Sequence, residues 1–280
     1  MIASRRGRIG NLLTYAAMLP LAAFFLAPVL WLASLALRTQ AEVFLGAARF
    51  FPEAPTLANF VQVITDGGFR TYLWNSVKLS ALGAAGAVAF AAPAAYAFSR
   101  MRFRGRPALM MAILSVQMVS GLVVLIPLYR YMDRLGLLET HLGAALLYIS
   151  AGIPVTVWLL KTSFDAVPRE LEEAAAIDGL GRAEIFARVT LPLAAPGIAS
   201  ALILNMILNW SQFLIPFIML SDASKWPISV GIFTFAGATN AATTQLLAAA
   251  CLVAILPALA VFVALQRMIV SALTSGAVKG

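Results

Sequence analysis

The sequence predicts an all-α integral membrane protein with six transmembrane helices. Its 280 residues are 61% hydrophobic and only 11% charged, and its mean hydropathy is +0.90. An average soluble domain is roughly 45–50% apolar and about 25% charged. Six apolar stretches are near the ~20 residues that a helix needs to cross a bilayer. This composition excludes a disordered chain, a nucleic-acid-binding module and an ordinary soluble enzyme.

The six stretches follow one another along a single predicted transmembrane domain, residues 1–280. We expect spans over residues 12–37, 72–98, 107–129, 142–160, 193–220 and 246–265. A cleaved signal peptide is the alternative for the first stretch. Its uncharged run is far longer than the 7–15 residues of a signal-peptide core, which favours a true span.

The distribution of Lys and Arg predicts the orientation. With both termini cytoplasmic, thirteen of the 20 basic residues lie inside and seven lie outside. Basic residues resist translocation, and the dense group from Arg100 to Arg106 lies in a short loop where this rule applies well. The net charge of +8 therefore reflects topology, and we expect no nucleic-acid partner.

The stretch between the fourth and fifth spans, residues 164–192, differs from the other loops. Pro168 suits the first turn of a helix over 168–178, and acidic residues follow it. Leu171, Ala174, Ala175 and Asp178 share one face, and Gly179 supplies a left-handed cap. A second short helix is expected from Arg182 to Val189, ended by Pro192. An amphipathic segment lying on the membrane is the alternative, but acidic charges favour docking on a soluble partner.

The same loop resembles the "EAA" signature of ATP-binding-cassette (ABC) importer permeases. The resemblance rests on Glu173-Ala174-Ala175, Asp178-Gly179 and the pair Leu191-Pro192 at the family's spacing. Asn75-Ser76, Leu135-Gly136-Leu137 and the ending Gly276–Gly280 resemble the maltose-permease-type group of carbohydrate importers. The resemblance implies the type I permease fold, with residues 168–182 as the coupling helix that sits in a cleft of an ATPase.

That resemblance also implies a division of labour among partners in a bacterial inner membrane. They would be a second permease subunit, two cytoplasmic ATPase subunits, an extracytoplasmic solute-binding protein and membrane lipid. No phosphate-binding G-x-x-x-x-G-K-[ST] loop occurs in the chain. We therefore expect no enzyme activity and no cofactor here, with ATP and Mg²⁺ held by the partner ATPase. The implied ATPase-coupling residues are Glu173, Ala174, Ala175, Asp178, Gly179, Leu191 and Pro192.

Polar residues in the fifth span are candidates for a substrate pathway, because polar groups in hydrocarbon are costly. Asn205, Asn209 and Gln212 share one helix face, and Trp210 adds an aromatic ring. Amides beside a ring suit a sugar, whose hydroxyl groups and C–H faces they can contact. Gln117 is a weaker candidate. The alternative is that these amides only tie helices together.

An ion-coupled secondary transporter is the main rival. Such proteins usually need ionisable residues at mid-membrane, and none occupies the middle of a predicted span. One histidine and one cysteine, His141 and Cys251, form no catalytic or metal site. We expect His141 to be a solvated loop residue and conclude that an importer permease for a sugar-like solute explains the sequence best.

Overall fold

The computed structural model describes residues 3–45, 50–236 and 243–275. Every regular element in these ranges is a helix, which confirms the predicted all-α class. Contacts divide the chain into two compact units, residues 1–66 with 232–255 and residues 67–231 with 256–280. The single domain over 1–280 stays a prediction.

The first unit contains α1 (Ala3–Ala36), α2 (Gln40–Phe44), α3 (Ala58–Thr65), η4 (Ile232–Ala236) and the beginning of α14 (Thr244–Ser275). The buried amide of Asn59 donates at 2.8 Å to the carbonyl oxygens of both Ala36 and Arg38. These two bonds hold α3 at the end of α1, because they occupy carbonyl groups that the helix end leaves free.

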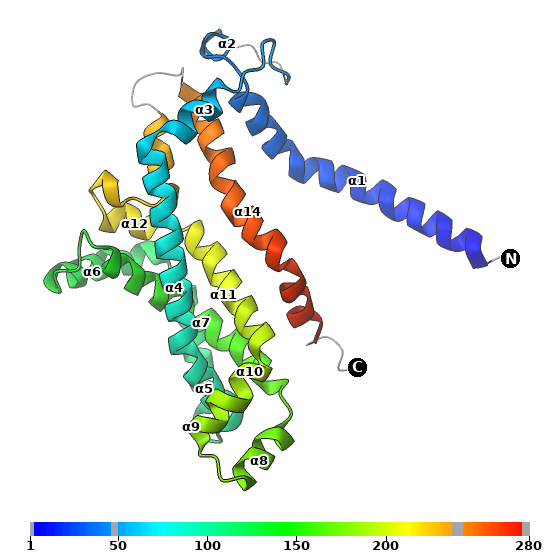
Figure 1. Ribbon diagram of the computed structural model, residues 1–280, viewed down its shortest axis with the longest axis vertical. Coiled ribbons are helices and arrows are strands. Elements are labelled where there is room, and N and C mark those ends of the chain that lie inside the picture. The colour runs from blue at the N-terminus through cyan, green and yellow to red at the C-terminus, as the bar shows by residue number, and fades with distance from the viewer. Residues whose placement is uncertain (1–2, 46–49, 237–242, 276–280) are drawn as a thin grey trace. The chain divides into compact units, whose positions relative to one another are not determined.

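The second unit is built on three packed helices, α4 (Gly67–Arg100), α7 (His141–Asp165) and α11 (Ala195–Trp210) (Figure 1). Ala84, Ala87, Ala91 and Ala95 recur at helical spacing along α4 and are at most 1% exposed. Without large side chains on this face, the backbones can approach closely, as in other membrane helices. Val157, Leu160 and Phe164 of α7 complete the core.

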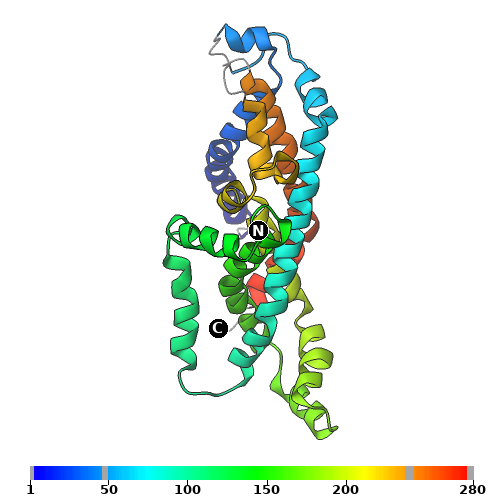
Figure 2. The ribbon, with the colours of Figure 1, turned by 90° about the vertical axis from the view of Figure 1, so that its left-hand side faces the viewer.

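The third predicted span, over residues 107–129, is bent in the structure. α5 (Arg106–Ser115) and the short η1 (Val116–Met118) lie at 93° to α6 (Gly121–Arg134) (Figure 2). Val119 and Ser120 between them have extended ψ values of 128°, which interrupts the helical hydrogen bonds.

The fifth predicted span, 193–220, is also not one helix. α9 (Arg182–Ile185), the π-helical η2 (Phe186–Thr190) and α10 (Leu191–Leu193) run continuously and meet α11 at 76°. α11 ends at Trp210, and the short α12 (Leu214–Met219) follows. The prediction that Pro192 ends a helix was wrong, because the chain turns two residues later at Ala194. The wider π turn gives room at the carbonyl that a proline ring would otherwise strike.

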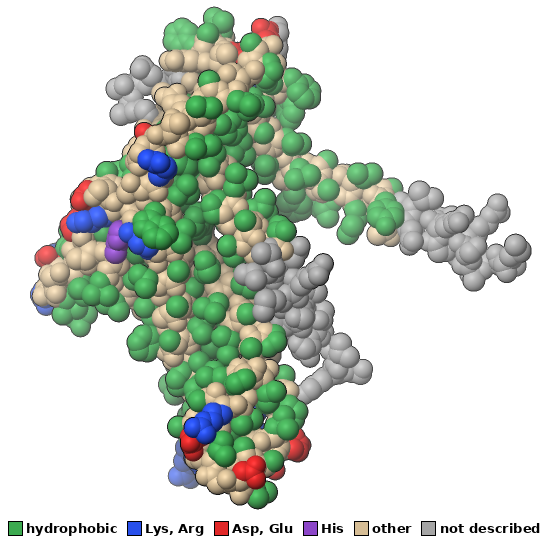
Figure 3. Space-filling view, viewed as in Figure 1, with side chains coloured by type: hydrophobic (Ala, Val, Ile, Leu, Met, Phe, Trp, Pro, Cys, Tyr) green, Lys and Arg blue, Asp and Glu red, His purple; other side chains and the backbone are tan. Residues whose placement is uncertain are grey.

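Four helical stretches in the described ranges are long and apolar enough to cross a membrane: Thr14–Ala36, Gly67–Arg100, His141–Asp165 and Thr244–Val263. The number rises to six if each bent pair is one span. In the second unit, the visible charged side chains gather at the two ends and the surface between them is largely hydrophobic (Figure 3). That pattern is typical of a lipid-facing protein.

Candidate functional site

The loop with the signature folds as a short exposed helix, α8 (Arg169–Ile177), placed after α7 and before α9. Pro168 is its N-cap, so the helix begins one residue after the predicted start. None of the residues of α8 is buried, and the side chain of Ile177 is 87% exposed. A helix with acidic charges and exposed Leu171 and Ile177 leaves apolar and polar surface available to a partner.

Gly179 ends this helix in the left-handed conformation that the sequence predicts. Its φ is +91°, and the N–H of Leu180 donates to the carbonyl of Ala175 at 3.1 Å while that of Gly179 reaches Ala176. These are the two bonds of a Schellman cap. A Cβ atom at residue 179 would meet nothing within 4 Å. The requirement for glycine is therefore purely a backbone requirement.

The predicted coupling residues differ in exposure. Glu173, Ala174, Asp178 and Gly179 are exposed, whereas Ala175 is half-buried. Leu191 and Pro192 lie on α10, where Leu191 packs against the core beside α4 and Pro192 is exposed. The structure thus places the Glu-Ala-Ala segment on the surface of α8 and the Leu-Pro pair in the helix that leads back into the bundle.

Beside α8 lies a hollow of about 630 Å³ with polar and apolar walls. Its lining includes four arginines, two glutamates and the ring of Phe103. The largely buried carboxylate of Glu172 belongs to this wall and contacts Arg100, which the sequence analysis missed. Two adjacent glutamates give no local signal of which one turns inward.

The amides of the fifth span line a second pocket of about 340 Å³. Asn205, Asn209, Ser211 and Gln212 form one wall, and Gln117 with the backbone of Ala151 and Gly152 forms another. The structure therefore brings together the three predicted amides and Gln117, which projects from the bend between α5 and α6.

Trp210 does not face this pocket. Its ring lines a smaller apolar hollow with Val77, Met206 and Pro257. Successive residues on a helix point about 100° apart, so a neighbour of Asn209 faces another side. The prediction that Trp210 acts with the amides is not supported by this arrangement, and an apolar contact is the role that its surroundings favour.

The asparagines also make bonds within the bundle. Asn205 is 2% exposed and donates to Thr156 Oγ1 on α7 and to the carbonyl of Ala201, both at 2.8 Å. Asn209 donates to the carbonyl of Ser80 on α4 at 3.5 Å. Each amide therefore fixes helix contacts and still borders the pocket, so the two interpretations of these residues are compatible.

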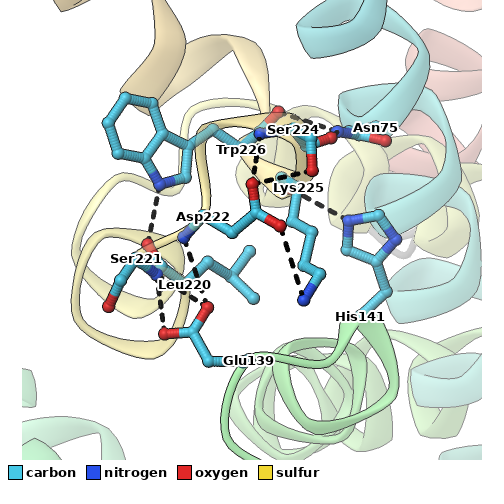
Figure 4. Close-up of polar contacts among 9 residues, drawn as sticks. All are labelled: Asn75, Glu139, His141, Leu220, Ser221, Asp222, Ser224, Lys225 and Trp226. Atoms are coloured by element: carbon cyan, nitrogen blue, oxygen red, sulfur yellow. Dashed lines mark hydrogen bonds and ion pairs between the residues drawn. The ribbon is translucent and has the colours of Figure 1, made fainter.

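At the opposite end of the second unit, side chains from three elements hold the loop that contains η3 (Ala223–Lys225) (Figure 4). Glu139 accepts from the backbone N–H of Ser221 at 2.8 Å and of Asp222 at 3.3 Å. His141, the first residue of α7, lies 2.9 Å from the carbonyl of Lys225, so a solvated loop role was wrong. Asn75 donates to the carbonyl oxygens of Ser224 and Trp226.

These hydrogen bonds lower the pKa of Glu139, with those from Ser221 the largest cause. Hydrogen bonds from Ser224 likewise lower the pKa of Asp222. Among the described residues, no three His, Cys, Asp or Glu side chains gather where they could hold a metal ion.

Comparison with known proteins connects these features. Residues 87–275 match the family described as "Binding-protein-dependent transport system inner membrane component". The sulfoquinovosyl glycerol transport system permease of Agrobacterium fabrum is 33% identical over 253 residues, covering 90% of this chain and 88% of that protein. The trehalose transport system permease of Mycobacterium tuberculosis is 33% identical over 258 residues, 92% and 93% of the two chains. The maltose/maltodextrin permease of Escherichia coli is 38% identical over 215 residues, 75% and 72% of the two chains.

Solved structures agree with the sequence relatives. A chain of a bacterial ABC transporter that imports the acidic polysaccharide alginate superimposes with a TM-score of 0.77 at 25% identity. The match covers 94% of this chain and 97% of that one. A methionine ABC transporter chain shares the fold more distantly, with a TM-score of 0.55 and 13% identity.

Proposed function

This chain belongs to the family of binding-protein-dependent transport system inner membrane components, and we propose that it is a permease subunit of an ATP-driven importer for a sugar or sugar-like solute. The single observation that carries the proposal is α8, a surface helix capped at Gly179 and inserted between membrane helices. A short exposed helix at this place suits the transfer of motion between a soluble partner and the bundle.

The sugar assignment is supported by the relatives and by the chemistry of the amide pocket. The relatives named above are transport system permeases for sulfoquinovosyl glycerol, trehalose and maltose/maltodextrin. Among the described residues, those that line the pocket include amides and a hydroxyl but no Asp, Glu, Lys, Arg or His. Uncharged donors and acceptors suit a neutral hydroxylated solute better than an acidic one. We propose that Asn205, Asn209, Gln212 and Gln117 face the pathway.

The proposed coupling surface consists of Glu173, Ala174, Ala175, Asp178 and Gly179, with Leu191 and Pro192 behind it. The exposed residues of this set would contact the ATPase directly, and Leu191 would transmit its movement to the core beside α4. The remaining proposed partners are a second permease subunit, two ATPase subunits that hold ATP and Mg²⁺, and a solute-binding protein.

The protein is a multi-pass inner-membrane protein, and we propose that both termini and α8 lie on the cytoplasmic side. This orientation places most Lys and Arg residues inside, in agreement with the rule for short loops. It also places α8 where ATP is available.

The test is transport by the complete complex in proteoliposomes. Labelled maltose, trehalose and a sulfonated glycoside would be offered with the binding protein outside and ATP inside. We expect uptake of a neutral sugar that requires both ATP and the binding protein. Uptake driven by a proton or sodium gradient without ATP would support the secondary-transporter alternative instead.

A further inference from the structure

We infer that Glu172 is the positioning residue of the coupling helix, fixing α8 to the end of α4 and to η2 through its carboxylate. The inference rests on the proposed function, because it explains how movement of α8 is passed to the bundle. Glu172 does not belong to the Glu-Ala-Ala segment, and its side chain points into the protein rather than toward a partner.

The carboxylate of Glu172 has donors from two other elements. Arg100 Nε at the end of α4 lies 2.9 Å from Oε1, and Thr190 Oγ1 on η2 donates to the same oxygen at 2.7 Å. Tyr96 on α4 donates to Oε2 at 3.3 Å. Only 11% of the side chain of Glu172 and 9% of that of Arg100 is exposed. One carboxylate therefore joins α4, α8 and η2.

Arg100 extends the connection to the turn that precedes α8. Its Nη2 donates to the carbonyl of Val167 at 2.8 Å, and its Nη1 lies 3.2 Å from Ser99 Oγ. Ser99 in turn donates to Asp165, the last residue of α7, at 2.6 Å. The guanidinium group thus contacts both the beginning of the connection to α8 and the helix itself.

This network determines the position of α8 more than it stabilises the fold. Desolvation of a nearly buried ion pair largely offsets its Coulomb attraction, so the pair adds little compared with apolar packing. Removing one partner is costly, because the other charge is then buried without a counterion. α8 contributes no buried side chain to the core, and these bonds supply the directional contact that its own packing lacks.

The contrast with Glu170 gives a matched control. Glu170 lies two residues earlier on the same helix, carries the same charge and is exposed. Loss of its charge changes the helix dipole interaction and the local charge as much as loss of Glu172 does, but it breaks no buried contact. Any difference between Glu170→Gln and Glu172→Gln therefore reports on the network.

The first experiment measures the position of α8 directly. Spin labels at residue 177 on α8 and residue 90 on α4, both exposed, would be introduced with Cys251 replaced by alanine. In the complete complex in lipid, we expect a narrow distance distribution for the parent and for Glu170→Gln. Glu172→Gln should broaden it clearly, and Tyr96→Phe, which removes one donor, should broaden it less.

The second experiment measures coupling in the corresponding complexes without spin labels, as solute transported per ATP hydrolysed. We expect Glu172→Gln to retain the ATPase subunits while the ratio falls about fivefold or more, since coupling between two sites typically corresponds to a factor of about five or more. The charge exchange Glu172→Arg with Arg100→Glu should recover part of the ratio, which a general folding defect would not allow.

An unchanged distance distribution together with a ratio equal to that of Glu170→Gln would overturn the inference. Failure of the proposed function looks different: the parent complex would then bind no ATPase or would show no hydrolysis stimulated by the binding protein. The spin-label result tests the position of α8 in either case.

Discussion

The amide of Asn209 on α11 lies directly against Gly83 on α4: a Cβ atom at residue 83 would come within 2.6 Å of its Nδ2 atom. The Cβ atom added at residue 83 would also lie 2.8 Å from Cβ of Tyr148 on α7. Three helices therefore meet where there is no room for a methyl group, beside the pocket that Asn209 borders.

Replacing Gly83 by alanine should disturb both packing and transport. The added methyl group must displace Asn209 or separate α4 from α7, and such overpacking costs about 1–3 kcal/mol. We expect a lower unfolding temperature and a several-fold lower uptake rate in proteoliposomes. Gly67→Ala on the same helix is the control, because its added methyl group would meet nothing within 4 Å. Equal behaviour of the two variants would show that the contact between Asn209 and residue 83 is loose.

Asn209→Leu and Trp210→Ala should have different effects, because the two side chains face different pockets. Loss of the Asn209 amide removes a polar contact worth about 1–3 kcal/mol, so uptake should fall about tenfold while the complex still assembles. Trp210→Ala should mainly lower the unfolding temperature, since it empties an apolar site. Parallel measurements of uptake and of thermal unfolding for both variants test this. An equal loss of uptake in the two variants would indicate that Trp210 also contacts the substrate pathway.

Glu139 should hold the loop at Ser221 and Asp222 only while it is ionised. Its pKa is lowered in the folded protein, so its contribution is complete above the ordinary carboxyl pKa and is lost as pH falls through the lower, folded value. At neutral pH, Glu139→Gln should therefore speed amide hydrogen exchange at residues 221 and 222 relative to the parent. This difference should vanish in strong acid, where Asp222 is also neutral.

Asp133→Asn on α6 is the control for charge, since Asp133 is exposed and lies six residues before Glu139 in the sequence. Faster exchange in Asp133→Asn than in Glu139→Gln would mean that overall charge, not the hydrogen bonds of Glu139, protects the loop.

Cysteine labelling tests the proposed orientation. With Cys251 replaced by alanine, Arg104→Cys should react with an impermeant thiol reagent only after the membrane is opened. Arg134→Cys should react in intact spheroplasts. Both positions are exposed in the structure, so a lack of reaction reports the membrane barrier rather than burial. The reverse pattern would invert the topology and place α8 outside the cell.

Patterns in the sequence predicted the features that depend only on residues close together in the chain. Gly179 follows an acidic, alanine-rich helix, and its positive φ could be expected because glycine tolerates that backbone. The face shared by Asn205, Asn209 and Gln212 follows from helical spacing. Trp210 was grouped with them against that same spacing, and its different surroundings could have been expected.

Features that depend on distant residues could not be predicted in this way. Glu172 and Glu173 are equivalent in sequence, and the difference arises because Arg100 and Thr190, far along the chain, lie beside Glu172 alone. The bend at Ala194 carries no glycine and follows a proline that the helix accommodates through a π turn. Such positions are decided by tertiary packing, which overrides local preference.

The final prediction concerns Gly179, whose φ of +91° is far from the range that side chains with a Cβ atom prefer. A left-handed backbone costs an ordinary residue about 1–2 kcal/mol, and a β-branched residue more. Among the described residues, no atom lies within 4 Å of the new Cβ atom, so we expect this backbone strain to be the main effect of Gly179→Val. It is too small to unfold a protein with several membrane helices, but it can be relieved by turning α8 relative to α9.

We therefore expect Gly179→Val to insert normally and to pair with the second permease, yet to lose ATPase binding or the hydrolysis that the loaded binding protein stimulates. Gly179→Asn should be milder, because asparagine tolerates the left-handed region better. Gly181→Val is the matched control: its φ is −72°, and its added Cβ would make only an ordinary contact with Glu184. Co-purification of the ATPase, followed by ATPase assays in lipid, compares the three variants. Normal stoichiometry and normal stimulated turnover in Gly179→Val would show that the direction of α8 does not matter for coupling.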